Sequence, residues 1–419
     1  MLARVRPPRR LRGSPRLPGD KSISHRALIL GAVADGESVI EGLASGQDVL
    51  STARCLQALG VQIKDGRVAG VGLGGLHPAS GALDCGNSGT SMRLLAGLLA
   101  GQSFVSELVG DASLSRRPMA RVVDPLLEMG AVASHPPLRV GGGGGLRGGE
   151  HRLAVASAQV KSALLLAGLY AHGDTVVIEP APTRDHTELM LRAMGVELEI
   201  GPGRVRMTPP SSLHPLRIQI PGDLSAAAFW LVAAGIHPQS EIDLLGVGVN
   251  PTRSRLLDVL AALGADLGRE NMRQVGSEAV ADLRPRGRLA APGLQLGADE
   301  VAALIDEMPI LAVAATCLPG GSRISGAGEL RNKESDRLRA MSLGLGAMGA
   351  AIEETPDGWV IEGGSGLHGA RVDAMGDHRV AMALAIAALV AEGETEIDGA
   401  ECVDISYPGF WEELDRLCS

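Results

Sequence analysis

An internal repeat is the feature that most constrains how this chain of 419 residues can fold. Amphipathic helical runs that end in the pattern Leu-x-x-Leu/Met-Gly recur along the chain, and each is followed by a strand-like run. We call these helix ends tails. Glycine at that position suits the left-handed residue that ends a helix. Because successive tails lie about 65 to 85 residues apart, six copies fill the chain. The tails are Leu56 to Gly60, Leu191 to Gly195 and Leu260 to Gly264, altered copies ending at Gly130 and Gly349, and a last copy without glycine, Trp411 to Leu417.

Each copy also carries a second helical run upstream, rich in Ala and Leu and followed by a Gly turn and a strand. A helix that is apolar on all sides is buried. The repeated unit is therefore a buried helix, a strand, a polar loop, an amphipathic helix and a strand, which predicts an α/β protein of six modules. The buried helices begin near Lys21, Asn87, Ser157, Gly222, Asp306 and Asp377.

The length predicts two or three domains, because a chain of this size exceeds what one core usually organises. Six modules divide most simply as three plus three. The similar segments at Pro18-Gly19-Asp20 and Pro221-Gly222-Asp223 are candidate hinges. We therefore expect a discontinuous domain of residues 1–17 and 223–419, an inserted domain of residues 18–222, and an active site in the cleft between them.

Composition excludes several classes of protein. The net charge of -9 and the eight aromatic residues argue against nucleic-acid binding. The buried helices, at about 13 to 16 residues, are too short to span a bilayer. The Arg-rich start has no apolar segment typical of a secretory signal. Five cysteines without CxxC or metal-ligand spacing indicate buried thiols in a cytoplasmic protein, with no metal and no cofactor.

Lysine is rare among the 39 basic residues, and only Lys21, Lys64, Lys161 and Lys333 are lysines. All but Lys64 lie in short polar segments that open a helical run. A chain that otherwise uses arginine keeps lysine mainly where a compact charge is required, and helix N-termini are where anions bind. The alternative is chance placement in a genome biased toward arginine codons.

Polar residues gather in the loops of the repeat. Equivalent loops of a repeated fold lie at equivalent ends of the modules, so these residues can converge on one cleft. In an acidic protein, so many cations indicate one or two strongly anionic small molecules. The alternative for any one loop is a set of surface ion pairs. The residues are Lys21, Ser22, Arg26, Asn87, Thr90, Arg93, Arg116, Arg117, Ser157, Gln159, Lys161, Arg184, Asp185, His186, Asp306, Glu307, Lys333, Glu334, Arg337, Asp377, His378 and Arg379.

Eight motifs in order resemble the 5-enolpyruvylshikimate-3-phosphate synthase family, also called 3-phosphoshikimate 1-carboxyvinyltransferase. The resemblance runs from about Leu17 to Leu417. It implies two domains, each of three βαβαββ units around a pseudo-threefold axis, an inside-out α/β barrel. The motifs are PGDKSISHRAL, GNSGTSMRLL, GDASLSRRPM, SAQVKSALLLAGLYA, TRDHTE, IDEMPILAVAA, ELRNKESDR and GDHRVAMALAIAAL.

The resemblance implies a transferase that moves the enolpyruvyl group of phosphoenolpyruvate to the 5-hydroxyl of shikimate 3-phosphate, on the way to chorismate and the aromatic amino acids. It implies that shikimate 3-phosphate is held by Lys21, Ser22, Arg26, Ser157, Gln159, Arg184, Asp306 and Lys333. It implies that phosphoenolpyruvate is held by Lys21, Gly89, Arg117, Gln159, Arg337 and Arg379. We expect a monomer with no partner besides these substrates.

The chemistry explains the catalytic residue types. The attacking hydroxyl must lose a proton, which Asp306 can accept, and C3 of phosphoenolpyruvate must gain one, which Glu334 can supply. Lys21 and the arginines would stabilise charge on the carboxylate and the leaving phosphate.

Two positions depart from the family pattern. Ile405 stands where one branch has a lysine, and Ala158 replaces the second serine of a Ser-Ser-Gln motif. Two alternatives stay open. A UDP-N-acetylglucosamine enolpyruvyl transferase has a similar fold, but its first motif has Lys-Asn where this chain has Lys21-Ser22. A non-catalytic anion-binding module would gain nothing from Asp306 and Glu334.

Gly89 lies in the turn that opens a buried helix, where a bare backbone lets an anion approach closely. The resemblance places phosphoenolpyruvate there, and glyphosate occupies that subsite in sensitive family members. We therefore expect inhibition by glyphosate. The alternative is that Gly89 is only a turn residue with positive φ.

Overall fold

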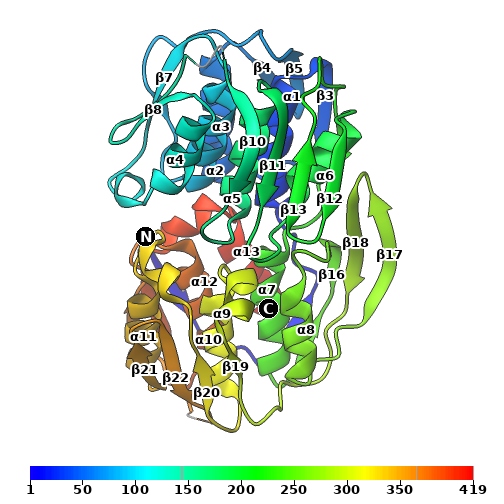
Figure 1. The fold of residues 1–419 in the computed structure, drawn as a ribbon. Coiled ribbons are helices and arrows are strands. Elements are labelled where there is room, and N and C mark those ends of the chain that lie inside the picture. The colour runs from blue at the N-terminus through cyan, green and yellow to red at the C-terminus, as the bar shows by residue number, and fades with distance from the viewer. Residues whose placement is uncertain (143–144, 365, 419) are drawn as a thin grey trace. The chain divides into compact units, whose positions relative to one another are not determined.

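The structure, a computed structural model, describes residues 1–142, 145–364 and 366–418. The chain forms two compact units (Figure 1). We call Gly19–Ile220 with Gln274–Glu278 the inserted unit, and Met1–Pro18, Pro221–Arg273 and Ala279–Ser419 the terminal unit.

The inserted unit alternates helices and short strands along the chain. Its elements are α1 (Lys21–Ala32), β3 (Asp35–Glu41), α2 (Gln47–Ala58), β4 (Gln62–Lys64), β5 (Arg67–Val71), β6 (Leu83–Asp84), α3 (Gly89–Ala100), β7 (Val105–Val109), η1 (Leu114–Arg116), α4 (Ala120–Glu128), β8 (Val132–Ser134), β9 (Leu138–Gly141), β10 (Arg147–Arg152), α5 (Ala158–Gly168), β11 (His172–Ile178), α6 (His186–Ala193), β12 (Leu198–Gly201), β13 (Arg204–Met207) and β14 (Arg217–Gln219).

Three four-stranded sheets of the inserted unit share one topology. Their orders are β14-β3-β5-β4, β6-β7-β9-β8 and β10-β11-β13-β12. In each sheet the first two strands are parallel and the other pairings are antiparallel. The parallel pair needs a crossover, and a buried helix supplies it in the second and third sheets. The threefold repetition predicted from the sequence is therefore present in this unit.

The terminal unit begins with two strands from the start of the chain and continues after the inserted unit. Its elements are β1 (Leu2–Val5), β2 (Leu11–Gly13), α7 (Leu224–Ile236), β15 (Ser240–Ile242), β16 (Leu244–Gly248), α8 (Arg255–Ala262), β17 (Arg269–Val275), β18 (Glu278–Leu283), β19 (Gln295–Leu296), α9 (Ala298–Leu304), α10 (Met308–Cys317), β20 (Ser322–Ile324), η2 (Gly328–Asn332), α11 (Arg337–Ala347), β21 (Ala351–Thr355), β22 (Gly358–Glu362), β23 (Arg371–Asp373), α12 (His378–Ala388), β24 (Thr395–Asp398), η3 (Ala400–Ile405) and α13 (Phe410–Cys418).

The sheets of the terminal unit are less regular. The order β19-β20-β22-β21 repeats the topology of the inserted unit, whereas the other sheets are β16-β18-β17, β1-β24-β23 and β15-β2. The strand β1 from the N-terminus pairs antiparallel with β24, so the two ends of the chain complete one sheet.

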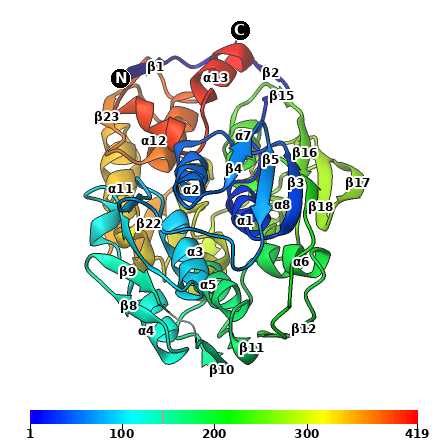
Figure 2. The ribbon, with the colours of Figure 1, turned by 90° about the horizontal axis from the view of Figure 1, so that it is seen from above.

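Six helices form the cores of the two units, as the apolar runs predict. All 13 residues of α7 are buried, and every residue of α12 is buried as well. Helix α3 contacts α1 and α5 in the inserted unit, and α7, α10 and α12 contact one another in the terminal unit. Both views show α3 beside α5 (Figure 1 and Figure 2). The polar start of each of these helices marks where its buried stretch begins.

The amphipathic helices end as the repeat predicts. The glycines that follow α2 and α6, Gly60 and Gly195, have φ of +96° and +91°. These angles lie in the left-handed region that only glycine adopts freely, so each glycine stops its helix and turns the chain into the next strand.

One segment lies in a unit that the sequence did not indicate. The turn Gln274–Glu278 between β17 and β18 belongs to the inserted unit, although both strands lie largely in the terminal unit. Glu278 accepts a hydrogen bond from buried His186, with Oε1 2.7 Å from Nδ1. Among the described residues, no helix is long and apolar enough to cross a membrane.

Candidate active site

The starts of α1, α3 and α5 carry several of the predicted site residues of the inserted unit. Their N-cap residues Asp20, Ser88 and Ser157 each accept a hydrogen bond from a backbone N–H of the first turn. The remaining N–H groups and the helix dipole favour an anion at such an end. These three helix starts therefore hold Lys21, Ser22, Gly89, Ser157 and Gln159, all predicted site residues.

A hydrogen-bonded chain joins α3 to α5. Arg93 Nη1 donates to Gln159 Oε1 at 2.7 Å, and Gln159 Nε2 donates to Thr90 Oγ1 at 2.9 Å. The Gln159 amide is thereby fixed in orientation. Arg93 was one of many loop cations in the sequence and was not assigned to a substrate. Its placement one helical turn after Gly89 is the signal that could have singled it out.

Two guanidinium groups lie against the backbone of Gly89. A β-carbon at this position would lie 2.8 Å from Arg93 Nη1 and 3.2 Å from Arg117 Nη1. Arg117 is buried, and its Nη2 donates to Asn87 Oδ1 at 2.8 Å. Gly89 is the first residue of α3 and does not have a positive φ, so the alternative of a simple left-handed turn residue is wrong. Cations and helix N–H groups at this bare backbone suit a carboxylate or phosphate.

Helix α1 contributes cations that are already held by the protein. Lys21 Nζ lies 2.9 Å from Asp48 Oδ2. Arg26 is buried and donates to Thr187, to Ser162 and to the carbonyl of Ser22, which ties α1 to α5 and α6. Burial lowers the pKa of Arg26 to about 10, so it is still a cation at neutral pH.

Arg184, which precedes α6, reaches back to the start of α1. Its Nη1 donates to the Ser22 hydroxyl at 3.2 Å. The structure thus brings two predicted shikimate 3-phosphate contacts, Ser22 and Arg184, together at one helix end.

Lys161 and His186 differ from the expectation that they belong to the anion-binding set. Lys161 is buried, with Nζ 2.7 Å from Glu188 and 3.0 Å from Glu179, so its charge is compensated within the unit. His186 is bonded to Glu278 and is also buried. Both residues lie within helices, close to residues of the preceding loops. Position in the sequence alone does not show whether a side chain is directed into the interior of the unit or toward solvent.

Arg337 organises the acidic residues of the terminal unit. Its Nε donates to Asp377 Oδ2 at 2.7 Å, and its Nη2 donates to Glu334 Oε2 at 2.6 Å. Its Nη1 lies 3.9 Å from Asp306 Oδ1. Burial opposes the positive charge, but Asp377 and Glu334 outweigh this effect and hold the pKa of Arg337 above its ordinary value. One guanidinium therefore contacts both carboxylates predicted to transfer protons.

Lys333 and Arg379 complete this group. Arg379 Nη1 donates to the main-chain carbonyl of Asp306 at 2.8 Å. Burial lowers the pKa of Lys333, and nearby Asp306 and Glu329 offset part of that effect. Asp377 caps α12 by accepting from Arg379 N at 2.9 Å, a positioning role that the sequence did not assign.

The two departures from the family pattern lie in well-defined places. Ile405 ends η3 and packs against the core of the terminal unit, so its side chain supplies apolar contact where a lysine would supply charge. Ala158 is the first residue of α5, directly after the capping Ser157.

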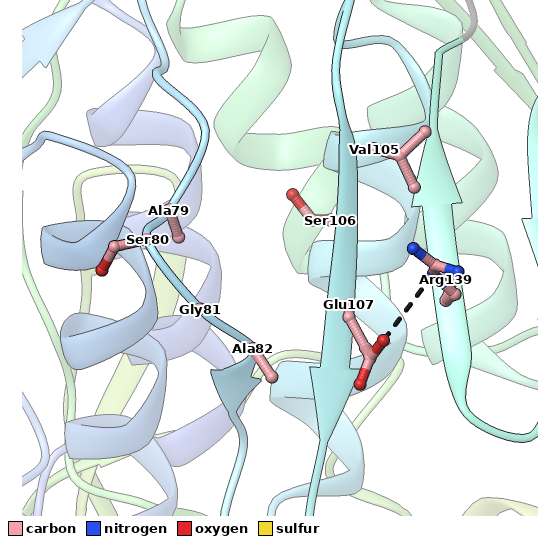
Figure 3. Close-up of a pocket in the computed structure, with 8 residues that line it drawn as sticks. All are labelled: Ala79, Ser80, Gly81, Ala82, Val105, Ser106, Glu107 and Arg139. Carbon is pink, nitrogen blue, oxygen red and sulfur yellow. Dashed lines mark ion pairs between the residues drawn. The ribbon is translucent and has the colours of Figure 1, made fainter.

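Other features carry no assigned chemistry. In the part of the chain that the structure describes, no group of three or more His, Cys, Asp or Glu could hold a metal ion. A pocket of about 260 Å³ lies between the segment 79–82 and β7 and is lined by none of the predicted site residues (Figure 3). Its charged lining residues, Glu107 and Arg139, pair with each other at 3.6 Å.

The inserted unit thus carries cations at helix N-termini, and the terminal unit carries carboxylates held by Arg337, residue types that suit strongly anionic small molecules and proton transfer. The family model described as EPSP synthase (3-phosphoshikimate 1-carboxyvinyltransferase) matches residues 5–414. A 3-phosphoshikimate 1-carboxyvinyltransferase from Synechococcus sp. is 53% identical, with 97% of each chain covered. One from Gloeobacter violaceus is 53% identical over 99% of this chain and 98% of that protein.

A solved structure of EPSP synthase from Acinetobacter baumannii is similar, with a TM-score of 0.87 and 41% identity, covering 99% of this chain and 98% of that one. The chain belongs to the EPSP synthase family. The predicted α/β class, family and transferase activity are confirmed. None of these relatives bears the name of the UDP-N-acetylglucosamine enzyme, the first alternative.

Proposed function

We propose that this protein transfers the enolpyruvyl group of phosphoenolpyruvate to the 5-hydroxyl of shikimate 3-phosphate, giving 5-enolpyruvylshikimate 3-phosphate and phosphate. The reaction belongs to the shikimate pathway and to aromatic amino acid biosynthesis, as the family implies. The observation that best supports it is the contact of Arg337 with both Asp306 and Glu334. A site that only bound anions would not place two carboxylates on a substrate-binding cation.

The polar residues are assigned to the two substrates in two overlapping sets, which share Lys21 and Gln159. The cations supply phosphate and carboxylate contacts, while hydroxyl and amide groups orient the ring. We assign shikimate 3-phosphate to Lys21, Ser22, Arg26, Ser157, Gln159, Arg184, Asp306 and Lys333. We assign phosphoenolpyruvate to Lys21, Gly89, Arg117, Gln159, Arg337 and Arg379.

The first step is an addition. Asp306 accepts the proton of the 5-hydroxyl as its oxygen bonds to C2 of phosphoenolpyruvate, and Glu334 gives a proton to C3, which becomes a methyl group. The product is a tetrahedral intermediate that still carries the phosphate. Arg337 lies against both carboxylates and so can orient them together.

The second step is an elimination. The C2–O bond to phosphate breaks and the leaving phosphate takes the proton held by Asp306, while C3 returns a proton to Glu334 and the new double bond forms. Both carboxyl groups thereby return to their starting protonation states. Lys21, Arg117 and Arg379 stabilise the charge that develops on the leaving phosphate. Because these cations are fixed by existing hydrogen bonds, little reorganisation is needed during the reaction.

A phosphate-release assay tests the proposal. The protein is supplied with phosphoenolpyruvate and either shikimate 3-phosphate or UDP-N-acetylglucosamine, and released phosphate is coupled to a colour change. We expect release only with shikimate 3-phosphate, and mass spectrometry should detect the enolpyruvyl product. Asp306→Asn serves as the control for contaminating phosphatase. Release that depends on UDP-N-acetylglucosamine would refute the assignment.

A further inference from the structure

The turn that carries Asp306 also carries a carboxylate directed into the core of the terminal unit. Glu307, the residue before α10, is 1% exposed. Its Oε1 accepts from the Ser225 hydroxyl at 2.5 Å and from Arg253 Nη1 at 3.0 Å. The proposed reaction uses none of these three residues, so their burial needs another explanation.

The partners of Glu307 come from two other places in the terminal unit. Ser225 lies in the first turn of α7, and Arg253 lies in the loop before α8. Asp223, the N-cap of α7, lies 4.0 Å from Arg253. All four residues are buried, and they connect the starts of three helices, α7, α8 and α10.

The corresponding start of α1 in the inserted unit is built differently. The segment Pro221 to Ser225 repeats Pro18 to Ser22, with Leu224 in place of Lys21. There the Ser22 hydroxyl accepts from the predicted substrate contact Arg184. Here the Ser225 hydroxyl donates to Glu307, so this helix start is directed to the protein rather than to an anion.

Stability alone does not account for the network. Buried ion pairs are often no more stabilising than apolar residues of the same volume, because each charge loses its hydration. What such a network does supply is a fixed geometry. The turn is also held from the other side, because the Asp306 carbonyl accepts from Arg379 at 2.8 Å.

We infer that Glu307, Arg253 and Ser225 are positioning residues that fix the main chain at Asp306 and so aim its carboxylate. The inference rests on the proposed role of Asp306 as the proton acceptor. A loosened turn should lower kcat, since small misplacements of a catalytic group are costly, while the contacts that bind phosphoenolpyruvate stay intact.

The test uses the full chain. Glu307→Gln should lower kcat by about 10- to 100-fold with the KM for phosphoenolpyruvate changed by less than about threefold. Thr316→Val is the matched control, because Thr316 is buried near the other end of α10 and its hydroxyl contacts only atoms of the same helix, the Val313 carbonyl and Cys317 Sγ. The control should lower the unfolding midpoint and leave kcat unchanged.

A double-mutant cycle separates positioning from a general loss of structure. In an Asp306→Asn background, Glu307→Gln should reduce the residual rate by less than about twofold. The reason is that the carboxylate whose position depends on Glu307 is already absent. Equal losses in both backgrounds would overturn the inference. If Asp306→Asn itself turns over like the wild type, the role of Asp306 as proton acceptor fails, whereas the proposed function fails only if the wild type releases no phosphate with shikimate 3-phosphate.

Ser225→Ala keeps both charges and removes the two hydrogen bonds of the hydroxyl, one donated to Glu307 and one accepted from Arg253, so it tests the same idea if Glu307→Gln does not fold. We expect a smaller loss of kcat in the same direction, again absent in the Asp306→Asn background. A Ser225→Ala enzyme with wild-type kcat would count against positioning by this network.

Discussion

Arg337 and Asp377 form a bidentate ion pair from which water is excluded. Nε lies 2.7 Å from Oδ2, Nη2 lies 3.2 Å from Oδ1, and the two side chains are 1% and 0% exposed. Asp377 also caps α12, so one carboxylate fixes both the helix start and the cation. The guanidinium is therefore held in place by contacts within the protein.

The pair should be sensitive to the loss of one charge. Asp377→Asn leaves Arg337 buried with less compensation, and we expect a loss of about 3–5 kcal/mol in the free energy of unfolding. Chemical denaturation measures it. Asp398→Asn is the control, because Arg371 and Asp398 make the same bidentate contact while being 67% and 39% exposed. That substitution should cost less than about 1 kcal/mol. Equal losses at the two sites would contradict the prediction.

Removal of either proposed proton-transfer group should affect turnover more than binding. Asp306→Asn and Glu334→Gln should each lower kcat by about 100-fold or more, as the loss of a general acid or base implies. Shikimate 3-phosphate should still bind, which titration calorimetry can measure. Wild-type turnover in either variant would exclude the role assigned to that residue.

Much of the fold follows from sequence patterns because those patterns are local. The apolar runs of α1, α3, α5, α7, α10 and α12 and the glycines that end the amphipathic helices need only the periodicity of a helix and the conformational freedom of glycine. The turn Gln274–Glu278 could not be predicted in this way. Its place beside His186 depends on a contact between residues 92 positions apart.

The direction of side chains is the other part that sequence could not provide. Lys21 and Lys161 each open a helical run, yet Lys161 is compensated by Glu179 and Glu188 in the interior. Glu179 directly follows β11 and Glu188 lies in α6, and no local pattern marks them as partners of Lys161. The positioning roles of Asp377 and Glu307 were missed for the same reason, because each is defined by a distant arginine.

Lys333 should make binding of shikimate 3-phosphate weaken at alkaline pH. Burial lowers its pKa below the ordinary value of 10.5, and the charged form is the one that binds the anion. Affinity should be complete at pH values below the lowered pKa and should fall as pH rises through it, before 10.5 is reached. The measurement is the KM for shikimate 3-phosphate as a function of pH.

A substitution that keeps the positive charge to higher pH tests whether deprotonation of Lys333 causes the rise in KM for shikimate 3-phosphate. Lys333→Arg should move the rise in KM to higher pH relative to its own plateau, because arginine stays protonated throughout that range. Lys64→Arg, at an exposed position, is the control and should leave the profile unchanged. A profile that is the same in all three proteins would show that another group titrates.

Gly89 should determine how the protein responds to glyphosate. We expect inhibition competitive with phosphoenolpyruvate, because the backbone at the start of α3 is bare and two arginines lie close to it. In Gly89→Ala the new methyl group would press on Arg93 and Arg117 from 2.8 Å and 3.2 Å, so their guanidinium ends must shift. A longer ligand has less room to adjust than the shorter substrate, and the ratio of Ki for glyphosate to KM for phosphoenolpyruvate should rise about tenfold or more.

Since the φ of Gly89 is not positive, the variant should fold normally. Gly81→Ala, where an added β-carbon meets nothing within 4 Å, should leave both constants unchanged. An unchanged ratio in Gly89→Ala would show that the inhibitor does not approach this backbone.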